Sequence, residues 1–158
     1  MYQTISSGLR DANMTNATAV SFGFPDTKVA ETGSWLILVR PKQPTFGSLV
    51  LICKEEAQAF SDLSAEAFSD LQVAVSGIET MLRRLVAYEK INYLMLMMVD
   101  RDVHFHVIPR YAGERVDAGV SFPDAGWPAV PNLVAAVDLG PEGAAKLADR
   151  LRREWPQA

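Results

Sequence analysis

The sequence has almost no cysteine, no excess of positive charge and no long apolar run, and each shortage excludes a class of protein. Cys53 is the only cysteine among 158 residues, so no internal disulfide can form and a reducing cytoplasm is the expected location. The formal net charge is −4, whereas a protein that coats nucleic acid needs a positive surface to release counterions from phosphates. No window reaches the roughly 18 apolar residues of a membrane helix. We therefore expect neither a membrane protein nor a partner of polymeric nucleic acid.

The residues that are present fit one compact domain. Hydrophobic residues make up 49% of the chain and charged residues 22%, which is typical of a soluble globular protein. The length is sufficient for a single hydrophobic core. We expect one domain over residues 1–158, in which residues 1–18 form a loose arm and residues 112–158 form a C-terminal extension with a terminal helix.

Apolar runs predict the strands of a sheet. Residues 34–40 and 48–53 are apolar, rich in strand formers and separated by a loop that contains proline and glycine, so we expect an antiparallel pair. An earlier strand is expected around residues 20–24. Residues 91–100 form a nearly continuous apolar run, which is typical of a strand buried on both faces.

Helical patterns follow the first strands and end the chain. Ser64 can cap a helix, and apolar residues then recur at steps of three and four from Phe68 to Leu85. A terminal helix is expected to start near Pro141, with Leu147 and Leu151 on one face. The order of the elements predicts an α+β domain with helices on one side of an antiparallel sheet.

Both histidines of the chain lie in one short run, VDRDVHFHVIPRY, residues 99–111. We expect a strand here that neighbours the preceding apolar run and ends at Pro109. Because a strand alternates its faces, Asp102, His104 and His106 share one face, and the apolar residues between them can enter the core. We expect the polar face to look outward or into a cleft. A neutral imidazole, with an ordinary pKa near 6.5, is a competent nucleophile towards phosphorus.

Two other interpretations of the histidines are open at this point. In the first, they are surface residues without a chemical role. In the second, His104 and His106 bind zinc. Asp102 lies roughly 13 Å along the strand from His106, which is too far for both to share an ion at ligand distances of about 2 Å. A zinc site would therefore need a donor from elsewhere in the chain.

The run HFHVIPR, residues 104–110, resembles the motif of the histidine triad (HIT) superfamily of nucleotide-binding hydrolases and transferases. The family motif is His-x-His-x-His followed by two apolar residues and often by Pro-Arg, and Asp102 stands here at the first histidine position. Residues 38–51 and 62–71 also resemble the loop, strand and helix start of the family. The resemblance implies a five-stranded antiparallel sheet, one long helix and one or two shorter helices. It also implies a homodimer in which two sheets join.

The same resemblance implies roles for individual residues. His104 would attack the α-phosphorus of a nucleotide and carry a transient nucleotidyl group, and His106 would bind phosphate oxygens. Asp102 would complete the catalytic set. Its anion would weaken phosphate binding unless it were neutralised, whereas a protonated carboxyl could donate to the leaving group. The further candidates for ligand contact are Ser48, which replaces a family histidine, and Arg40, Arg110 and Asn92. Aromatic residues that could stack on a base are Phe22, Phe24 and Trp35.

By this resemblance the chain would hydrolyse a phosphoramidate or a dinucleoside polyphosphate, or transfer a nucleotidyl group, with no redox cofactor and no required metal. The alternative is a nucleotide-binding module with little or no turnover. Asp102, Ser48 and the missing glutamine-bearing insertion before the triad favour that alternative. A metalloprotein that uses His104 and His106 is a third hypothesis. The leading interpretation requires both rings to point into a hollow that accepts an anion.

Overall fold

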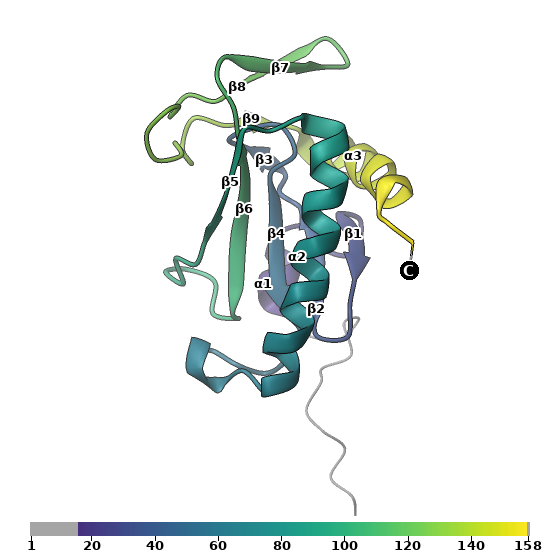
Figure 1. Ribbon diagram of the computed structural model, residues 1–158, viewed down its shortest axis with the longest axis vertical. Coiled ribbons are helices and arrows are strands. Elements are labelled where there is room, and N and C mark those ends of the chain that lie inside the picture. The colour runs from purple at the N-terminus through teal and green to yellow at the C-terminus, as the bar shows by residue number, and fades with distance from the viewer. Residues whose placement is uncertain (1–15, 158) are drawn as a thin grey trace, which may run out of the picture.

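A five-stranded antiparallel sheet forms the centre of the computed structural model, which describes residues 16–157 (Figure 1). The strand order is β1-β2-β4-β6-β5, and every neighbouring pair is antiparallel. These strands are β1 (Lys28–Glu31), β2 (Trp35–Val39), β4 (Leu49–Cys53), β6 (His104–Arg110) and β5 (Lys90–Leu94). The pairing of β2 with β4 across the loop between them confirms the pair predicted from the two apolar runs.

Two helices cover one face of the sheet. The long helix α2 (Ala65–Val86) begins at Ser64, whose hydroxyl accepts a hydrogen bond from the Ala67 N–H, as the sequence predicts. It ends at Ala87 in a left-handed conformation. The terminal helix α3 (Gly140–Glu154) packs beside β1 and β2 and buries Leu147 and Leu151, which confirms the predicted apolar face.

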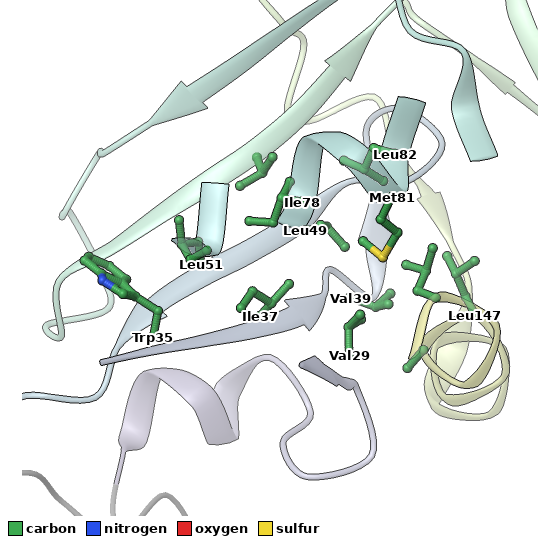
Figure 2. Close-up of a cluster of buried hydrophobic side chains, with 14 of the residues drawn as sticks. Val29, Trp35, Ile37, Val39, Leu49, Leu51, Ile78, Met81, Leu82 and Leu147 are labelled. Atoms are coloured by element: carbon green, nitrogen blue, oxygen red, sulfur yellow. The ribbon is translucent and has the colours of Figure 1, made fainter. Parts of the chain in front are cut away.

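The larger part of the core lies between the sheet and these two helices. Figure 2 shows Ile37 and Val39 of β2 and Leu49 and Leu51 of β4 pointing towards the helices. The alternate side chains of both strands point the other way, and residues of both sets are fully buried. Strands that are apolar on both faces need cover on both faces, and this requirement fixes the position of the remaining helix.

That helix, α1 (Ala17–Ser21), covers the second face of the sheet. Ala19, Phe22 and Phe24 pack against a layer of alternate residues from β2 and β4, namely Leu36, Leu38, Val50 and Ile52. In Figure 2 the helix lies on the opposite side of β2 from the labelled core residues. The expectation that all helices lie on one side of the sheet is therefore wrong.

The smaller elements lie around this framework. They are the pair β3 (Lys42–Gln43) and β9 (Val137–Asp138), the hairpin of β7 (Glu114–Asp117) and β8 (Val120–Pro123), and a short 3-10 helix η1 (Phe60–Asp62). The hairpin and the connection to β9 lie beyond one end of the sheet (Figure 1). Among residues 16–157, no helix combines the length and apolarity that crossing a bilayer would require.

The strand predicted around residues 20–24 is wrong, because α1 and a turn occupy this segment. The side chain of Asn16 accepts from the Ala19 N–H and starts the helix. Gly23, at φ +89°, then takes a backbone conformation that a strand does not use. Asn16 and Thr18 are buried, so the last residues of the arm expected over 1–18 instead belong to the fold. Residues 1–15 lie outside the described part.

Two predicted strand ends are also wrong. β5 stops at Leu94, and the apolar residues Met98 and Val99 further along are exposed rather than buried. β6 continues through Pro109 to Arg110. The pairing of β6 with β4 ends at Val107, so beyond that residue β6 has a neighbour on one side only, where proline is tolerated.

Candidate active site

β6 presents the two histidines on the face of the sheet that α1 covers. Val103 precedes the strand and Val107 lies in it, and both side chains are buried in the core beneath α2, as the alternation predicts. His104 and His106 point the other way, and their ring centroids lie 5.2 Å apart. The sequence pattern and the strand geometry therefore bring the two imidazoles together on one surface.

A hydrogen bond to Nδ1 fixes the tautomer of the neutral His104 ring. Nδ1 lies 2.6 Å from the backbone carbonyl oxygen of Asp102. Because a carbonyl oxygen can only accept, Nδ1 of the neutral ring carries the proton and donates it to this bond. The lone pair of the neutral imidazole is then on Nε2. A neutral imidazole held in this tautomer is suited to nucleophilic attack.

His106 and Arg40 contribute two buried nitrogen atoms to the same region. The His106 Nδ1 and the Arg40 Nε are both buried and have no hydrogen-bond partner among residues 16–157. Burial, and next the positive charge of Arg40, lower the pKa of His106 to about 4. Leaving a buried donor unsatisfied typically costs about 1–3 kcal/mol, so a bound acceptor here would relieve a penalty present in the free protein.

The rings do not face an open hollow, and the expectation that they would is wrong. The exposed fraction is 2% for His104 and 8% for His106. Phe22, which follows α1, packs against both rings at centroid distances of 6.4 and 5.9 Å. Of the three aromatic residues considered for base stacking, Phe22 alone touches the histidines in the described structure. Trp35 lies in the core on the other face and donates to the Ala67 carbonyl.

Asp102 forms hydrogen bonds with α1 and is buried, so its carboxylate is not exposed beside the histidines. Its carboxylate Oδ2 accepts from the Thr18 N–H at 3.3 Å, and its own N–H donates to the Thr18 Oγ1 at 3.2 Å. Nearby, the single hydroxyl hydrogen of Ser21 has two acceptors within reach, the Thr18 carbonyl at 2.8 Å and the Asp100 carboxylate at 3.0 Å. Thr18, Ser21 and Asp100 carry no motif that marks them in the sequence, and the signal for this helix is the capping side chain of Asn16.

Ser48 is fully buried inside the loop that precedes β4. Its hydroxyl donates to the Thr45 carbonyl at 2.8 Å and also accepts from the Thr45 N–H at 3.3 Å. Gln43 accepts from the backbone of the same turn. These contacts give Ser48 a structural role, and we do not retain it as a ligand-binding residue.

Arg110 and Asn92 lie away from the histidines, near the opposite end of β6. Arg110 forms a buried ion pair with Asp124, at 2.7 Å, and donates to the Asn92 Oδ1 at 2.8 Å. Four residues of strand, about 13 Å, separate Arg110 from His106. Arg110 and Asn92 instead line a cavity of about 750 Å³ between β5 and residues 127–131. The structure therefore separates them from the candidate site.

The described residues do not form a cluster of metal-binding side chains. Within residues 16–157, no group of three or more histidine, cysteine, aspartate or glutamate side chains is placed to hold one. His104 and His106 therefore have no third donor of these types in the described part of the chain.

Comparisons with solved structures identify the fold. A histidine triad protein from Sinorhizobium meliloti matches with a TM-score of 0.66 at 19% identity, over 87% of this chain and 93% of that chain. The diadenosine triphosphate hydrolase of Plasmodium falciparum matches with a TM-score of 0.59 at 14% identity, over 84% and 80%. The C. elegans NitFhit protein matches with a TM-score of 0.60 at 19% identity, over 82% of this chain and only 27% of that one.

No protein-family model and no curated protein matches the sequence. The structural matches, together with the sheet order and the single long helix, show that this chain has the histidine triad fold. The fold implied by the resemblance of residues 104–110 is thereby confirmed.

Proposed function

We propose that this chain is a nucleotide-binding hydrolase or nucleotidyl transferase of the histidine triad type, acting at the α-phosphorus. The observation that carries the proposal is the hydrogen bond from the His104 Nδ1 to the Asp102 carbonyl, which directs the lone pair to Nε2. The histidine triad fold and the diadenosine triphosphate hydrolase among its structural neighbours support the substrate class.

The proposed reaction has two steps. The Nε2 lone pair forms a bond to the α-phosphorus while the bond to the leaving group breaks. The leaving group departs with its electron pair and takes up a proton from solvent, which the acceptor of the second step returns on losing its own. Water, or another acceptor, then attacks the nucleotidyl-histidine and releases the nucleotide. Asp102 acts here as a positioning residue, because its carbonyl fixes the tautomer of His104.

Arg40 and His106 are the proposed binding groups for the phosphate. Their unpartnered nitrogens, the Nε of Arg40 and the Nδ1 of His106, are buried in the same region of the fold. An anion bound there would accept a hydrogen bond from the Arg40 Nε, and one from the His106 Nδ1 in the tautomer that carries the proton on that nitrogen. Its negative charge would raise the pKa of His106, which burial and Arg40 lower. Hydrogen bonds to charged groups are typically worth about 1.5–3 kcal/mol, so Arg40 should contribute strongly to affinity.

Substituting Arg40 tests this binding site. We expect Arg40→Gln to weaken the binding of AMP by about 10- to 100-fold, as measured by isothermal titration calorimetry. Lys42→Gln is the matched control, because it removes the same charge from an exposed side chain two residues away. The Arg40 side chain donates to the backbone carbonyl of Lys42, and Lys42→Gln retains that carbonyl. Equal dissociation constants for the two variants would exclude Arg40 from the site.

A second candidate function is nucleotide binding without turnover. The burial of both histidine rings and the contact between Asp102 and α1 favour it, since neither is expected of an accessible catalytic site. The two functions differ in one assay, in which AMP binding is measured beside turnover of a nucleoside phosphoramidate and a dinucleoside polyphosphate. Binding without turnover would leave the non-catalytic module as the function.

We also propose that the chain forms a homodimer through β5. This strand is the last in the described sheet, with β6 as its only partner there, and the exposed residues Leu96, Met98 and Val99 follow it. An unpaired strand edge beside exposed apolar side chains suits addition of a second sheet. Sedimentation equilibrium should give twice the chain mass, and a monomer at micromolar concentration would refute the dimer.

A cytoplasmic location remains a prediction from the single cysteine.

A further inference from the structure

The segment over residues 16–22 closes the face of the sheet on which the two histidines lie. α1 and the Phe22 ring cover His104 and His106, and leave them almost fully buried. A nucleotide is far larger than the remaining exposed surface of the rings. Under the proposed function, this segment must therefore move before a phosphorus atom can reach His104.

Within residues 16–157, polar contacts of three side chains help to hold the segment. Thr18 and Asp102 exchange two hydrogen bonds, one in each direction. The Ser21 hydroxyl lies 3.0 Å from the Asp100 carboxylate, which shares its hydrogen with the Thr18 carbonyl at 2.8 Å. The Asn16 side chain donates to the Cys53 carbonyl at 3.2 Å. Two of these contacts use the aspartates that flank residue 101, directly before the histidine strand.

The apolar contacts of α1 itself are weak, and the main apolar contact of the segment comes from Phe22, which follows the helix. The helix has five residues, and its buried members are Thr18 and Ala19, whereas Val20 is exposed. A helix this short is not stable by itself in water, so its position depends on its contacts with the rest of the fold. A buried alanine contributes far less than a buried leucine or phenylalanine. The hydrogen bonds to Asp102 and Asp100 are therefore a substantial part of what holds α1 in place.

The other end of the segment is firmly attached. The Thr27 hydroxyl donates to the Phe22 carbonyl at 2.8 Å, and the Val39 N–H of β2 donates to the Thr27 carbonyl at 2.9 Å. Gly23 follows at φ +89°. Movement of residues 16–21 together with a rotation of the Phe22 side chain would thus uncover the rings without disturbing the sheet.

We propose that residues 16–22 form a lid over His104 and His106, that Asp102 and Asp100 latch it closed, and that its opening controls access to His104. The proposal rests on the proposed function only for the identity of the ligand that enters. Asp102 has a second role in this account, because its carboxylate holds the lid while its carbonyl orients the ring of His104.

Chemical modification of the histidines by diethyl pyrocarbonate measures this opening directly. The chain has only two histidines, so in untagged protein the ultraviolet signal of carbethoxyimidazole reports on these rings alone. In the wild-type protein we expect a rate at least about tenfold below that of N-acetylhistidine, because the reagent reaches the rings only in the open state. The rate should change little with urea below the unfolding transition, because a local opening exposes little surface.

Variants of the latch should react faster. Ser21→Ala removes the hydroxyl that lies between the Asp100 carboxylate and the Thr18 carbonyl, and it should raise the rate about two- to tenfold. Asp102→Asn weakens the bond to Thr18 and should give a similar or larger increase. Ser76→Ala is the control, because it makes the same change at an exposed position on α2 and should leave the rate unchanged. Circular dichroism would show that each variant is folded.

Two results would overturn the lid. The first is a reaction rate of the wild-type protein equal to that of N-acetylhistidine. The second is a reaction rate no higher than that of the wild-type protein in both Ser21→Ala and Asp102→Asn. The probe is diethyl pyrocarbonate and no nucleotide is present. A chain that failed to bind AMP would therefore refute the proposed function without changing the outcome of this experiment.

Discussion

Replacing His104 with glutamine is expected to reduce turnover of a nucleoside phosphoramidate or dinucleoside polyphosphate by about 10⁴-fold or more. The Nε2 of His104 is the proposed nucleophile, and its tautomer is fixed by the hydrogen bond to the Asp102 carbonyl. The Nδ1 of His106, the other histidine, has no such partner among residues 16–157. Glutamine retains a similar size and polarity but has no nucleophilic nitrogen. Steady-state kinetics with purified, untagged protein measures the effect.

The same substitution two residues further along provides the matched comparison. His106→Gln should lower turnover by about 10²–10³-fold, because it removes stabilisation of the phosphate oxygens and leaves the nucleophile in place. A His104→Gln variant that keeps more than about a tenth of the wild-type rate would exclude His104 as the nucleophile. Circular dichroism and thermal unfolding would show whether either variant is misfolded.

Asp124→Asn is expected to lower the free energy of unfolding by about 3–5 kcal/mol. The side chains of Arg110 and Asp124 are only 5% and 1% exposed, and the substitution leaves the guanidinium charge buried without its counter-ion. Asp124 also accepts from the Tyr111 N–H at 3.2 Å, and Arg110 donates to the Ala129 carbonyl at 2.8 Å. The pair thus joins the end of β6 to the long connection that follows β8.

Asp117→Asn is the control for this stability effect. Asp117 pairs with Arg150 at 2.8 Å, but these side chains are 23% and 39% exposed, so the change should cost less than about 1 kcal/mol. Urea unfolding monitored by circular dichroism gives both values. Similar losses in the two variants would show that burial does not distinguish these ion pairs and would remove the structural role assigned to Arg110.

The elements that the sequence predicted correctly are those in which a local pattern and the tertiary environment agree. The apolar runs of β2 and β4 are long enough to define strands, and the capping serine and apolar stripe of α2 are strong local signals. The alternation along β6 likewise placed Val107 in the core and His104 and His106 on the other face. The resemblance of the same run to the histidine triad motif implied the sheet.

The errors fall where a distant residue decides the structure. Residues 20–24 carry aromatic side chains that favour a strand, but Asn16 and Gly23 produce a helix and a turn, and the second face of the sheet needs a cover. Arg110 stands beside the histidine motif in sequence, yet its partner Asp124 lies in a turn-rich segment that offers no periodic signal. Neither the burial of the histidines nor the contact of Asp102 with Thr18 could be predicted, because both depend on α1 folding over β6.

If His104 forms a covalent bond to the phosphorus of a nucleotide, mass spectrometry of a quenched reaction will detect the adduct. Wild-type protein mixed with an adenosine phosphoramidate and quenched in alkali, where phosphoramidates of histidine persist, should gain the mass of one adenylyl group. Peptide mapping should place that group on His104. Rapid turnover with no adduct at any quench time, or an adduct confined to His106 or to another residue, would contradict the account.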